Sequence, residues 1–157
     1  MVETLSSAIQ GVTLLQITTL AIAFLGAVLG IINTWHGLDK SRVKLRVSPA
    51  HAIPVGGAPS SIGLSITVTN LSAFAVTVCD VGIQFRWSKK RGTFFSPMTA
   101  DGGKWPRRLE PRSSVTIYAE RPDSRSNGRI RCAYATTECG VEQTGNSPAL
   151  KQMARDG

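Results

Sequence analysis

The residue types that most often perform catalysis or hold metal ions are few in this sequence of 157 residues, and they lie far apart. The thiols and imidazoles belong to Cys79, Cys132, Cys139, His36 and His51. Structural zinc sites contain a close pair of such ligands, and nucleophilic sites need a base beside the nucleophile. Neither pattern is found, and the phosphate-loop, zinc-protease and hydrolase motifs are also absent. We therefore predict no enzyme activity, no catalytic residue, no metal site and no cofactor.

The three cysteines also bear on the compartment of the protein. An odd number of thiols cannot all pair with one another, which agrees with a reducing environment. We expect free thiols that are buried or half-buried. A disulfide between Cys132 and Cys139 across a hairpin is the alternative that their spacing leaves open.

Basic residues form the most informative clusters. The chain has 18 Lys and Arg against 10 Asp and Glu, a formal net charge of +8 that attracts anionic surfaces. One cluster lies on a predicted hairpin tip and the other in a long loop around a tryptophan. The candidate residues for binding an anionic surface or partner are Lys89, Lys90, Arg91, Lys104, Trp105, Arg107, Arg108 and Arg112.

Several ligands fit such clusters. Anionic lipid headgroups are one, because each cation near a membrane surface contributes about 1 kcal/mol of binding. An acidic protein partner is another, and a solvated surface that binds nothing is a third interpretation. Nucleic acid is disfavoured, because the sequence contains no stacking or groove-reading motif. Arg129 and Arg131 would add to the basic surface, since they share the outer face of one predicted strand.

An uncharged apolar segment, residues 12–35, precedes the main part of the chain. As a helix its 24 residues measure about 36 Å, enough to cross a hydrocarbon core of about 30 Å. It has no polar stripe of the kind that a surface helix of a soluble protein shows. The preceding residues contain no Lys or Arg, unlike the start of a secretory signal peptide. We predict a single transmembrane helix that is retained as an anchor in the lipid bilayer.

The flanks of this segment set its expected orientation. Glu3 is the only charged residue before Asp39, whereas basic residues crowd the other flank. Cytoplasmic flanks of membrane spans carry the excess of Lys and Arg, and tryptophan is enriched at the interface. The predicted membrane-interface residues are Trp35, Lys40, Arg42, Lys44 and Arg46. The N-terminus is expected outside the cell and the remaining domain in the cytoplasm.

Small residues lie along one side of the predicted helix. Gly26 and Gly30 form a G-x-x-x-G motif, with Ala23 and Ala27 beside them. Small side chains let a second helix approach closely within lipid. We expect this face to pack against a membrane-protein partner or a second copy of the chain; the alternative is the ordinary composition of a membrane span.

After residue 42 the pattern changes to the alternation of apolar and polar residues that is typical of strands. Leu64, Ile66 and Val68 are predicted to face inward, as are Ile83 and Phe85. A bulge or a change of sheet is expected at 79–80, where the alternation is interrupted. The predicted organisation is a tail (1–11), the transmembrane helix (12–35), a basic linker (36–42), a β-sandwich (43–145) and a short helix or tail (146–157) that Ser147 and Pro148 would begin.

Six or seven short strands separated by turns indicate a mainly β protein, an antiparallel sandwich of immunoglobulin-like architecture behind the helix. Residues 64–72, followed by 76–78 and 81–82, resemble the strand–turn–strand unit of bacterial immunoglobulin-like modules. Nearly the whole chain resembles small uncharacterised bacterial single-pass membrane proteins with such a domain. This resemblance implies an architecture and no activity.

The sequence therefore favours a non-enzymatic, membrane-anchored protein that acts as an interaction module or as an accessory subunit of a membrane complex. The alternative is a structural or envelope component, of a bacterial surface or a phage, with the β domain outside the cytoplasm.

Overall fold

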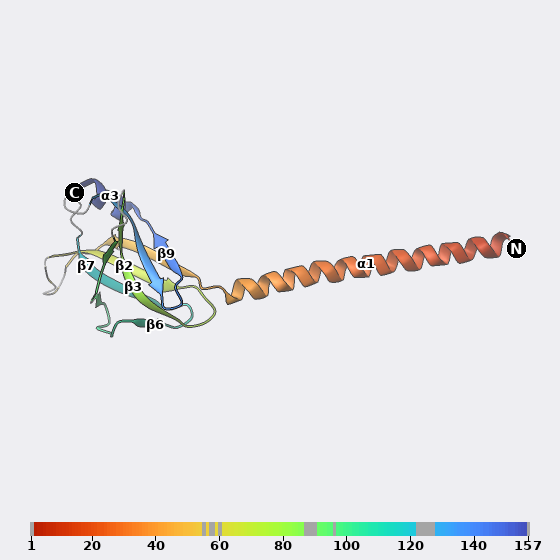
Figure 1. Cartoon of the computed structure of the whole chain (residues 1–157), viewed down its shortest axis with the longest axis horizontal. Helices are drawn as coiled ribbons and strands as arrows, with labels where there is room; N and C mark the ends of the chain where they lie inside the picture. The colour runs from red at the N-terminus through yellow and green to blue at the C-terminus, as the bar shows by residue number, and fades with distance from the viewer. Residues whose placement is uncertain are drawn as a thin grey trace. The chain divides into compact units, whose positions relative to one another are not determined.

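A computed structural model describes residues 2–54, 56, 59, 61–86, 91–95, 97–121 and 128–156. For residues 2–13 and 156 it describes the backbone only. The chain divides into two compact units between Arg42 and Val43, a helical unit and a β unit (Figure 1).

The helical unit consists of one forty-residue helix, α1 (Val2–Ser41). Its part from Leu14 to Ser41 is long and apolar enough to cross a membrane, by length and composition. The helix is longer at both ends than the span expected over 12–35. Residues 36–41, expected as a linker, are helical because Gly37 stands alone and a single glycine does not end a helix. Lys40 in the last turn also interacts favourably with the helix dipole.

The β unit contains nine strands within the described residues and ends in a short helix. The strands are β1 (Leu45–His51), β2 (Ile62–Asn70), β3 (Val76–Phe85), β4 (Arg91–Thr93), β5 (Met98–Thr99), β6 (Arg107–Leu109), β7 (Ser114–Glu120), β8 (Ile130–Thr137) and β9 (Glu142–Gly145), and the helix is α3 (Pro148–Asp156). One sheet has the order β1-β2-β7-β5, and the other has the order β4-β3-β8-β9 with β6 also paired to β3.

All strand pairs are antiparallel, and the two sheets form the predicted sandwich behind the helix. If the strands are lettered along the chain, with β4 as C′ and β6 left without a letter, the first sheet has the spatial order ABED of the immunoglobulin fold. The second sheet has its CFG strands with an additional C′ strand. The fold class is therefore confirmed. The described strands exceed the six or seven expected because β4, β5 and β6 are only two or three residues long, too short for the alternation of side chains to mark them.

The core lies between the two sheets, and β2 shows its pattern most clearly. The side chains of Leu64, Ile66 and Val68 are fully buried, and those of Ile83 and Phe85 on β3 are nearly so. These are the five residues that the alternation predicts to face inward. On the other face of the first sheet the hydroxyl oxygens of Thr67 and Thr116 lie 3.0 Å apart in a hydrogen bond.

The pairing of β3 with β8 contains the predicted bulge. Val78 pairs with Thr137, but Asp80 pairs with Thr136, so the register shifts at Cys79. The carbonyl oxygen of Cys79 accepts a hydrogen bond of 2.9 Å from Nε1 of Trp105. The bulge thereby ties the long segment between β5 and β6 to the middle of the sandwich.

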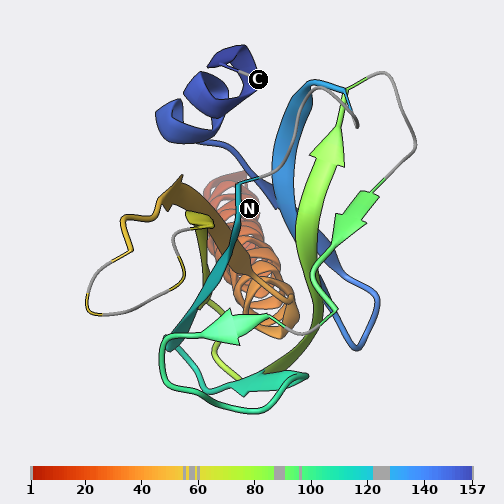
Figure 2. The same ribbon diagram turned by 90° about the vertical axis from the view of Figure 1, so that its left-hand side faces the viewer.

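The helix α3 covers one end of the sandwich. Ser147 caps its first turn, since the amide of Leu150 donates a hydrogen bond of 3.1 Å to the Ser147 hydroxyl. Leu150 and Met153 are buried and belong to the core of the sandwich. Figure 2 shows α3 (dark blue) at the same end of the unit as the end of β3 (light green).

Candidate functional site

The predicted hairpin-tip cluster is described only at Arg91, because Lys89 and Lys90 lie outside the described residues. Arg91 donates to Glu142 on β9 at 2.7 Å, and its guanidinium stacks over the ring of Tyr134 at 5.4 Å from the centroid. Both contacts occupy the Arg91 side chain within the second sheet. Arg91 therefore contributes less positive charge to the surface than its place in the sequence suggests.

The predicted loop cluster is partly neutralised by carboxylates. Arg107 pairs with Asp101, and Arg108 pairs with Glu110 at 3.3 Å. Hydrogen bonding from the backbone of Gly103 holds the pKa of Asp101 below its ordinary value, so this carboxylate keeps its charge. Two of the four cations of this loop are thus paired. The other two are exposed: they are Lys104 and Arg112, the latter in a turn with φ +61°.

Trp105 has a structural place. Its ring is half-buried against the core, and its indole N–H donates a hydrogen bond to the Cys79 carbonyl oxygen. An exposed tryptophan anchor for a membrane or a partner would need its ring in solvent. The loop pattern alone predicts Trp105 as a candidate binding residue and does not reveal this packing.

The helix-packing candidates are all exposed on α1. A Cβ atom added to Gly26 or Gly30 would meet nothing within 4 Å, so their side of the helix is open to a second helix. Ala23 and Ala27 are also exposed. The Thr34 hydroxyl donates to the Gly30 carbonyl oxygen at 2.8 Å, which removes this hydroxyl from the surface available to a partner.

The membrane-interface candidates fall in both units. Trp35 and Lys40 are exposed on α1, and Arg42 is exposed at its end. Lys44 and Arg46 belong to the β unit: the Lys44 amide donates to the Ser72 hydroxyl at 2.8 Å, and Arg46 lies on β1. The helical unit itself thus carries the first two of the four basic flanking residues.

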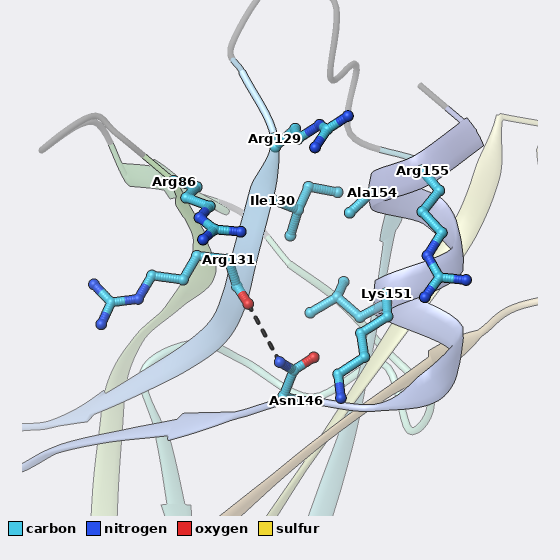
Figure 3. Close-up of a pocket in the computed structure, with 9 residues that line it drawn as sticks. Arg86, Arg129, Ile130, Arg131, Asn146, Lys151, Ala154 and Arg155 are labelled. Carbon is cyan, nitrogen blue, oxygen red and sulfur yellow. Dashed lines mark hydrogen bonds between the residues drawn. The ribbon is translucent and has the colours of Figure 1, made fainter.

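A groove lined by basic residues lies between β8 and α3 (Figure 3). Its volume is about 640 Å³. Five of its lining residues are cationic, and none of those that the structure describes is acidic. The lining consists of Arg86, Arg129, Ile130, Arg131, Asn146, Leu150, Lys151, Ala154 and Arg155.

Strand pairing places the arginines of this groove. Phe85 pairs with Ile130, so Arg86 just after β3 lies beside Arg129 just before β8, and the Arg86 amide donates to the Arg129 carbonyl oxygen at 2.6 Å. Arg131 is exposed because its neighbours Ile130 and Cys132 point to the buried face. Asn146 closes one side by donating to the Arg131 carbonyl oxygen at 3.4 Å.

The helix supplies the other side of the groove. Lys151 and Arg155 lie one turn apart on α3 and therefore on one helical face. Leu150 anchors that helix in the core, while Ala154 packs against the core and faces the groove. An apolar floor with cations at its rim results, an arrangement that raises the local concentration of anions.

Sequence reasoning found only part of this groove. The sequence predicts that Arg129 and Arg131 share the outer face of one strand, and that Ser147 begins a helix. It does not predict that they meet, because the two segments come together only through the burial of Leu150 and Met153 against the sandwich. The available signal is that Lys151 and Arg155 lie four residues apart in a helix with two apolar anchors.

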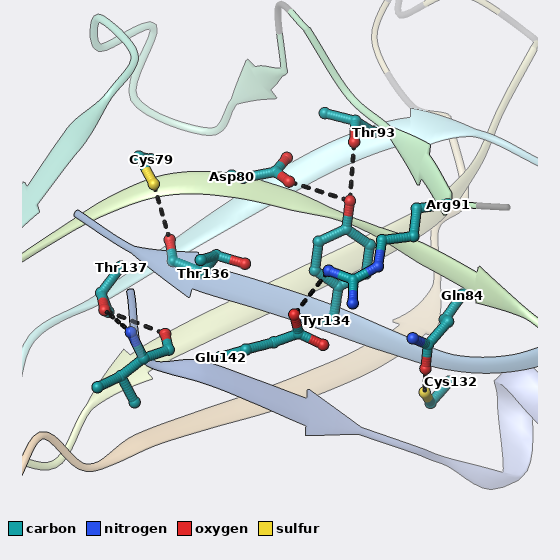
Figure 4. A network of polar contacts seen from close by, with 11 residues as sticks. Cys79, Asp80, Gln84, Arg91, Thr93, Cys132, Tyr134, Thr136, Thr137 and Glu142 are labelled. Atoms are coloured by element: carbon teal, nitrogen blue, oxygen red, sulfur yellow. Dashed lines mark hydrogen bonds and ion pairs between the residues drawn. The ribbon is translucent and has the colours of Figure 1, made fainter. Parts of the chain in front are cut away.

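A second polar cluster surrounds Tyr134, whose side chain is fully buried (Figure 4). The Tyr134 hydroxyl lies 2.8 Å from the Thr93 hydroxyl oxygen and donates to Oδ2 of Asp80 at 3.0 Å. Burial raises the pKa of Tyr134 above its ordinary value. The other Asp80 oxygen, Oδ1, is buried without a partner among the described residues. This cluster joins β3, β4 and β8, and its contacts are those of a structural network.

All three cysteines are free thiols, so the Cys132–Cys139 disulfide is not formed. Cys132 is buried and Cys139 is exposed. Burial raises the pKa of Cys132, whereas a hydrogen bond from the Thr137 side chain lowers the pKa of Cys139. Within the described residues, no group of three His, Cys, Asp or Glu side chains is placed to hold a metal ion.

No family model matches the chain, and no curated protein matches it.

Proposed function

We propose that this protein is a non-enzymatic, membrane-anchored interaction module in which α1 spans the lipid bilayer and the β-sandwich carries binding surfaces. The apolar surface of α1 carries this proposal. Its leucine and isoleucine side chains from Leu14 to Ile32 are exposed over the length of a membrane span. Each such side chain gains about 1.5–3 kcal/mol when it leaves water, so the helix needs an apolar surrounding.

The small-residue face of α1 is proposed to hold the partner, either a second copy of the chain or a larger membrane protein. Lipid tails offer no hydrophobic drive for helix association, so close backbone contact has to supply the attraction. Gly26 and Gly30 allow this contact because nothing lies within 4 Å of where their Cβ atoms would be. The protein would then serve as an accessory subunit of a membrane complex.

Replacing both glycines tests the proposal. The Gly26→Ile/Gly30→Ile variant should insert normally, because isoleucine is favourable in the bilayer, but it should lose helix association. The measurement is the associated fraction in a membrane two-hybrid assay, together with co-purification from detergent-solubilised membranes. The first assay reports self-association, and the second reports any other membrane-protein partner.

A matched control adds the same kind of bulk to the opposite face of the helix. Ala21 and Val28 lie roughly 180° from the two glycines at about 100° per residue. The Ala21→Ile/Val28→Ile variant should therefore associate as the parent chain does. Equal association in all three proteins would contradict the proposed face and would move the interaction to the β unit.

The orientation is part of the proposal. Lys40 and Arg42 at the C-terminal end of α1, with no Lys or Arg before them, support an outside N-terminus and a cytoplasmic β unit. Exposed Lys104 and Arg112 would then lie in the compartment that contains the anionic lipid headgroups of the inner leaflet and the cytoplasmic proteins. A β unit found outside the cytoplasm would instead support a structural or envelope component.

A further inference from the structure

We propose that the groove between β8 and α3 binds a soluble oligophosphate, a compact ligand with at least two linked phosphate groups. This inference concerns the β unit alone and does not depend on what α1 contacts. It rests on the charge, the donor chemistry and the size of the groove.

Four cations other than Arg86 concentrate positive charge in the groove. Within the part of the chain that the structure describes, carboxylates pair with Arg91, Arg107 and Arg108, and none pairs with the side chains of Arg129, Arg131, Lys151 or Arg155. These four cations line one groove with an apolar floor. Cations gathered over a low-dielectric surface repel one another, and a multiply charged anion removes that repulsion.

The donors suit phosphate oxygens. A guanidinium presents a planar fork that binds two oxygens of one phosphate, and a lysine adds a point charge. In the view of Figure 3, Arg129 and Lys151 stand on either side of Ile130 and Ala154. Asn146 uses one N–H on the Arg131 carbonyl oxygen and accepts from the Ser147 amide. The cationic side chains therefore supply most of the donors to a ligand.

The size of the groove favours a small ligand. A volume of about 640 Å³ falls within the range of roughly 300–1,000 Å³ that is usual for small-molecule sites. None of its described lining residues is aromatic, so it offers no platform for stacking a base. An extended acidic peptide spaces the carboxylates of one face by about 7 Å, whereas linked phosphates place several charges closer together.

Within the β unit, the groove and the residue that follows α1 lie at opposite ends of β3. The groove lies where β3 ends and β8 begins, beside the pair Phe85 and Ile130. Val43, which follows α1 in sequence, lines a different hollow beside Val76 at the start of β3. The ten residues of β3 span roughly 30 Å between these two ends.

The test titrates inorganic tripolyphosphate into the full chain in nanodiscs of neutral phosphatidylcholine, with binding measured by calorimetry. The parent chain should bind with saturation. The Arg129→Gln/Lys151→Gln variant, which loses one cation from each side, should bind at least about tenfold more weakly. The matched Arg46→Gln/Lys104→Gln variant loses the same charge from exposed positions outside the groove, and its affinity should change by less than about twofold, since salt screens distant charges.

Four results would overturn the proposal. In the first, the parent chain fails to bind tripolyphosphate, and in the second, both variants lose the same affinity for it. In the third, a hexaglutamate peptide competes with tripolyphosphate and binds the parent chain more tightly than tripolyphosphate does, which would make the ligand an acidic peptide. In the fourth, the Arg129→Gln/Lys151→Gln variant keeps its affinity for tripolyphosphate and loses binding only to nanodiscs that contain anionic lipid, which would make the ligand a lipid headgroup. Thermal unfolding of both variants confirms that each remains folded during the titration.

Discussion

A Cβ atom on Gly145 would lie 1.8 Å from the carbonyl oxygen of Val47, so the backbones of β9 and β1 touch at this point. β1 is the edge strand of one sheet and β9 is the edge strand of the other. The contact therefore closes one side of the sandwich, where only a glycine fits between the two strands.

The first prediction concerns this contact. Gly145→Ala should lower the free energy of unfolding by about 1–3 kcal/mol or more, because the added methyl group has to push the two strands apart. Thermal unfolding of the full chain in detergent, followed by near-ultraviolet circular dichroism, measures the effect. Gly92→Ala is the control, since its Cβ would meet its nearest atom, in the ring of Phe85, at an ordinary 3.4 Å. Equal losses in both variants would show that β9 and β1 are farther apart than described.

The second prediction concerns the core. Ile66→Ala should cost about 2–5 kcal/mol of stability, because it leaves a cavity at a fully buried position. Thr67→Ala on the other face should cost only about 0.5–1.5 kcal/mol, the usual contribution of the hydrogen bond that it makes with Thr116. Chemical denaturation of the two variants compares these values. A larger loss at Thr67 would mean that the side chains of β2 face the opposite way.

Local sequence patterns predict the parts of this fold that local physics decides. The alternation around Ile66 marks a buried face, the interruption at Cys79 marks the bulge, and Ser147 marks the start of α3. The two-residue strand β5 and the three-residue strand β6 are different, because their existence depends on partners far along the chain. No alternation can appear in so few residues.

The residues of the groove also divide into those that a local sequence pattern predicts and those that depend on distant parts of the chain. The sequence predicts that Arg129 and Arg131 lie on one outer strand face, because their neighbours are apolar. Their meeting with Lys151 requires α3 to pack on the end of the sandwich, which is a tertiary event without a local signal. The sequence also marks Trp105 as part of an exposed basic loop, whereas the ring packs against the core.

The third prediction follows from this placement of Trp105. Trp105→Phe keeps one aromatic ring but removes the pyrrole ring and its hydrogen bond to the Cys79 carbonyl oxygen, so it should destabilise the β unit by at least about 1–3 kcal/mol. Trp35→Phe should leave the unfolding midpoint of the β unit unchanged, because Trp35 is exposed on α1. Thermal unfolding distinguishes the two. A Trp105→Phe variant as stable as the parent chain would mean that the indole N–H contributes nothing to the fold.

The fourth prediction concerns alkaline pH. Burial raises the pKa of Tyr134, and it also raises the pKa of the Cys79 and Cys132 thiols. The folded state therefore holds these protons more tightly than the unfolded chain does. Their contribution to stability is complete below the unfolded pKa values, near about 8.5 for thiols and about 10 for tyrosine. It is lost as the pH rises from these values through the folded ones.

A variant isolates the share of the tyrosine. Tyr134→Phe should be less stable than the parent chain at neutral pH, because Thr93 and Asp80 lose a partner. Above about pH 10 its stability should fall less steeply than that of the parent chain. Denaturation curves collected at several pH values measure both effects. Parallel pH profiles for the two proteins would show that Tyr134 does not contribute to the alkaline loss.

The last prediction uses the difference between the thiols to determine the orientation of the membrane anchor. Cys139 is exposed, and the hydrogen bond from Thr137 lowers its pKa, so it carries more thiolate at neutral pH than an ordinary cysteine. Cys132 is buried and its pKa is raised. A maleimide that cannot cross membranes should therefore modify Cys139 first, and the Cys139→Ser variant should lose most of the labelling of the folded protein.

In intact cells the proposed orientation shields Cys139 from this reagent until the membrane is permeabilised. A Ser6→Cys substitution in the Cys139→Ser background is the matched control, because the N-terminal segment is proposed to lie outside and should be labelled at once. The readout is the mass shift of the purified chain before and after permeabilisation. Immediate labelling of Cys139 together with protection of the Ser6→Cys thiol would place the β unit outside the cytoplasm. The cationic groove would then face the extracytoplasmic space, and its oligophosphate would have to come from there.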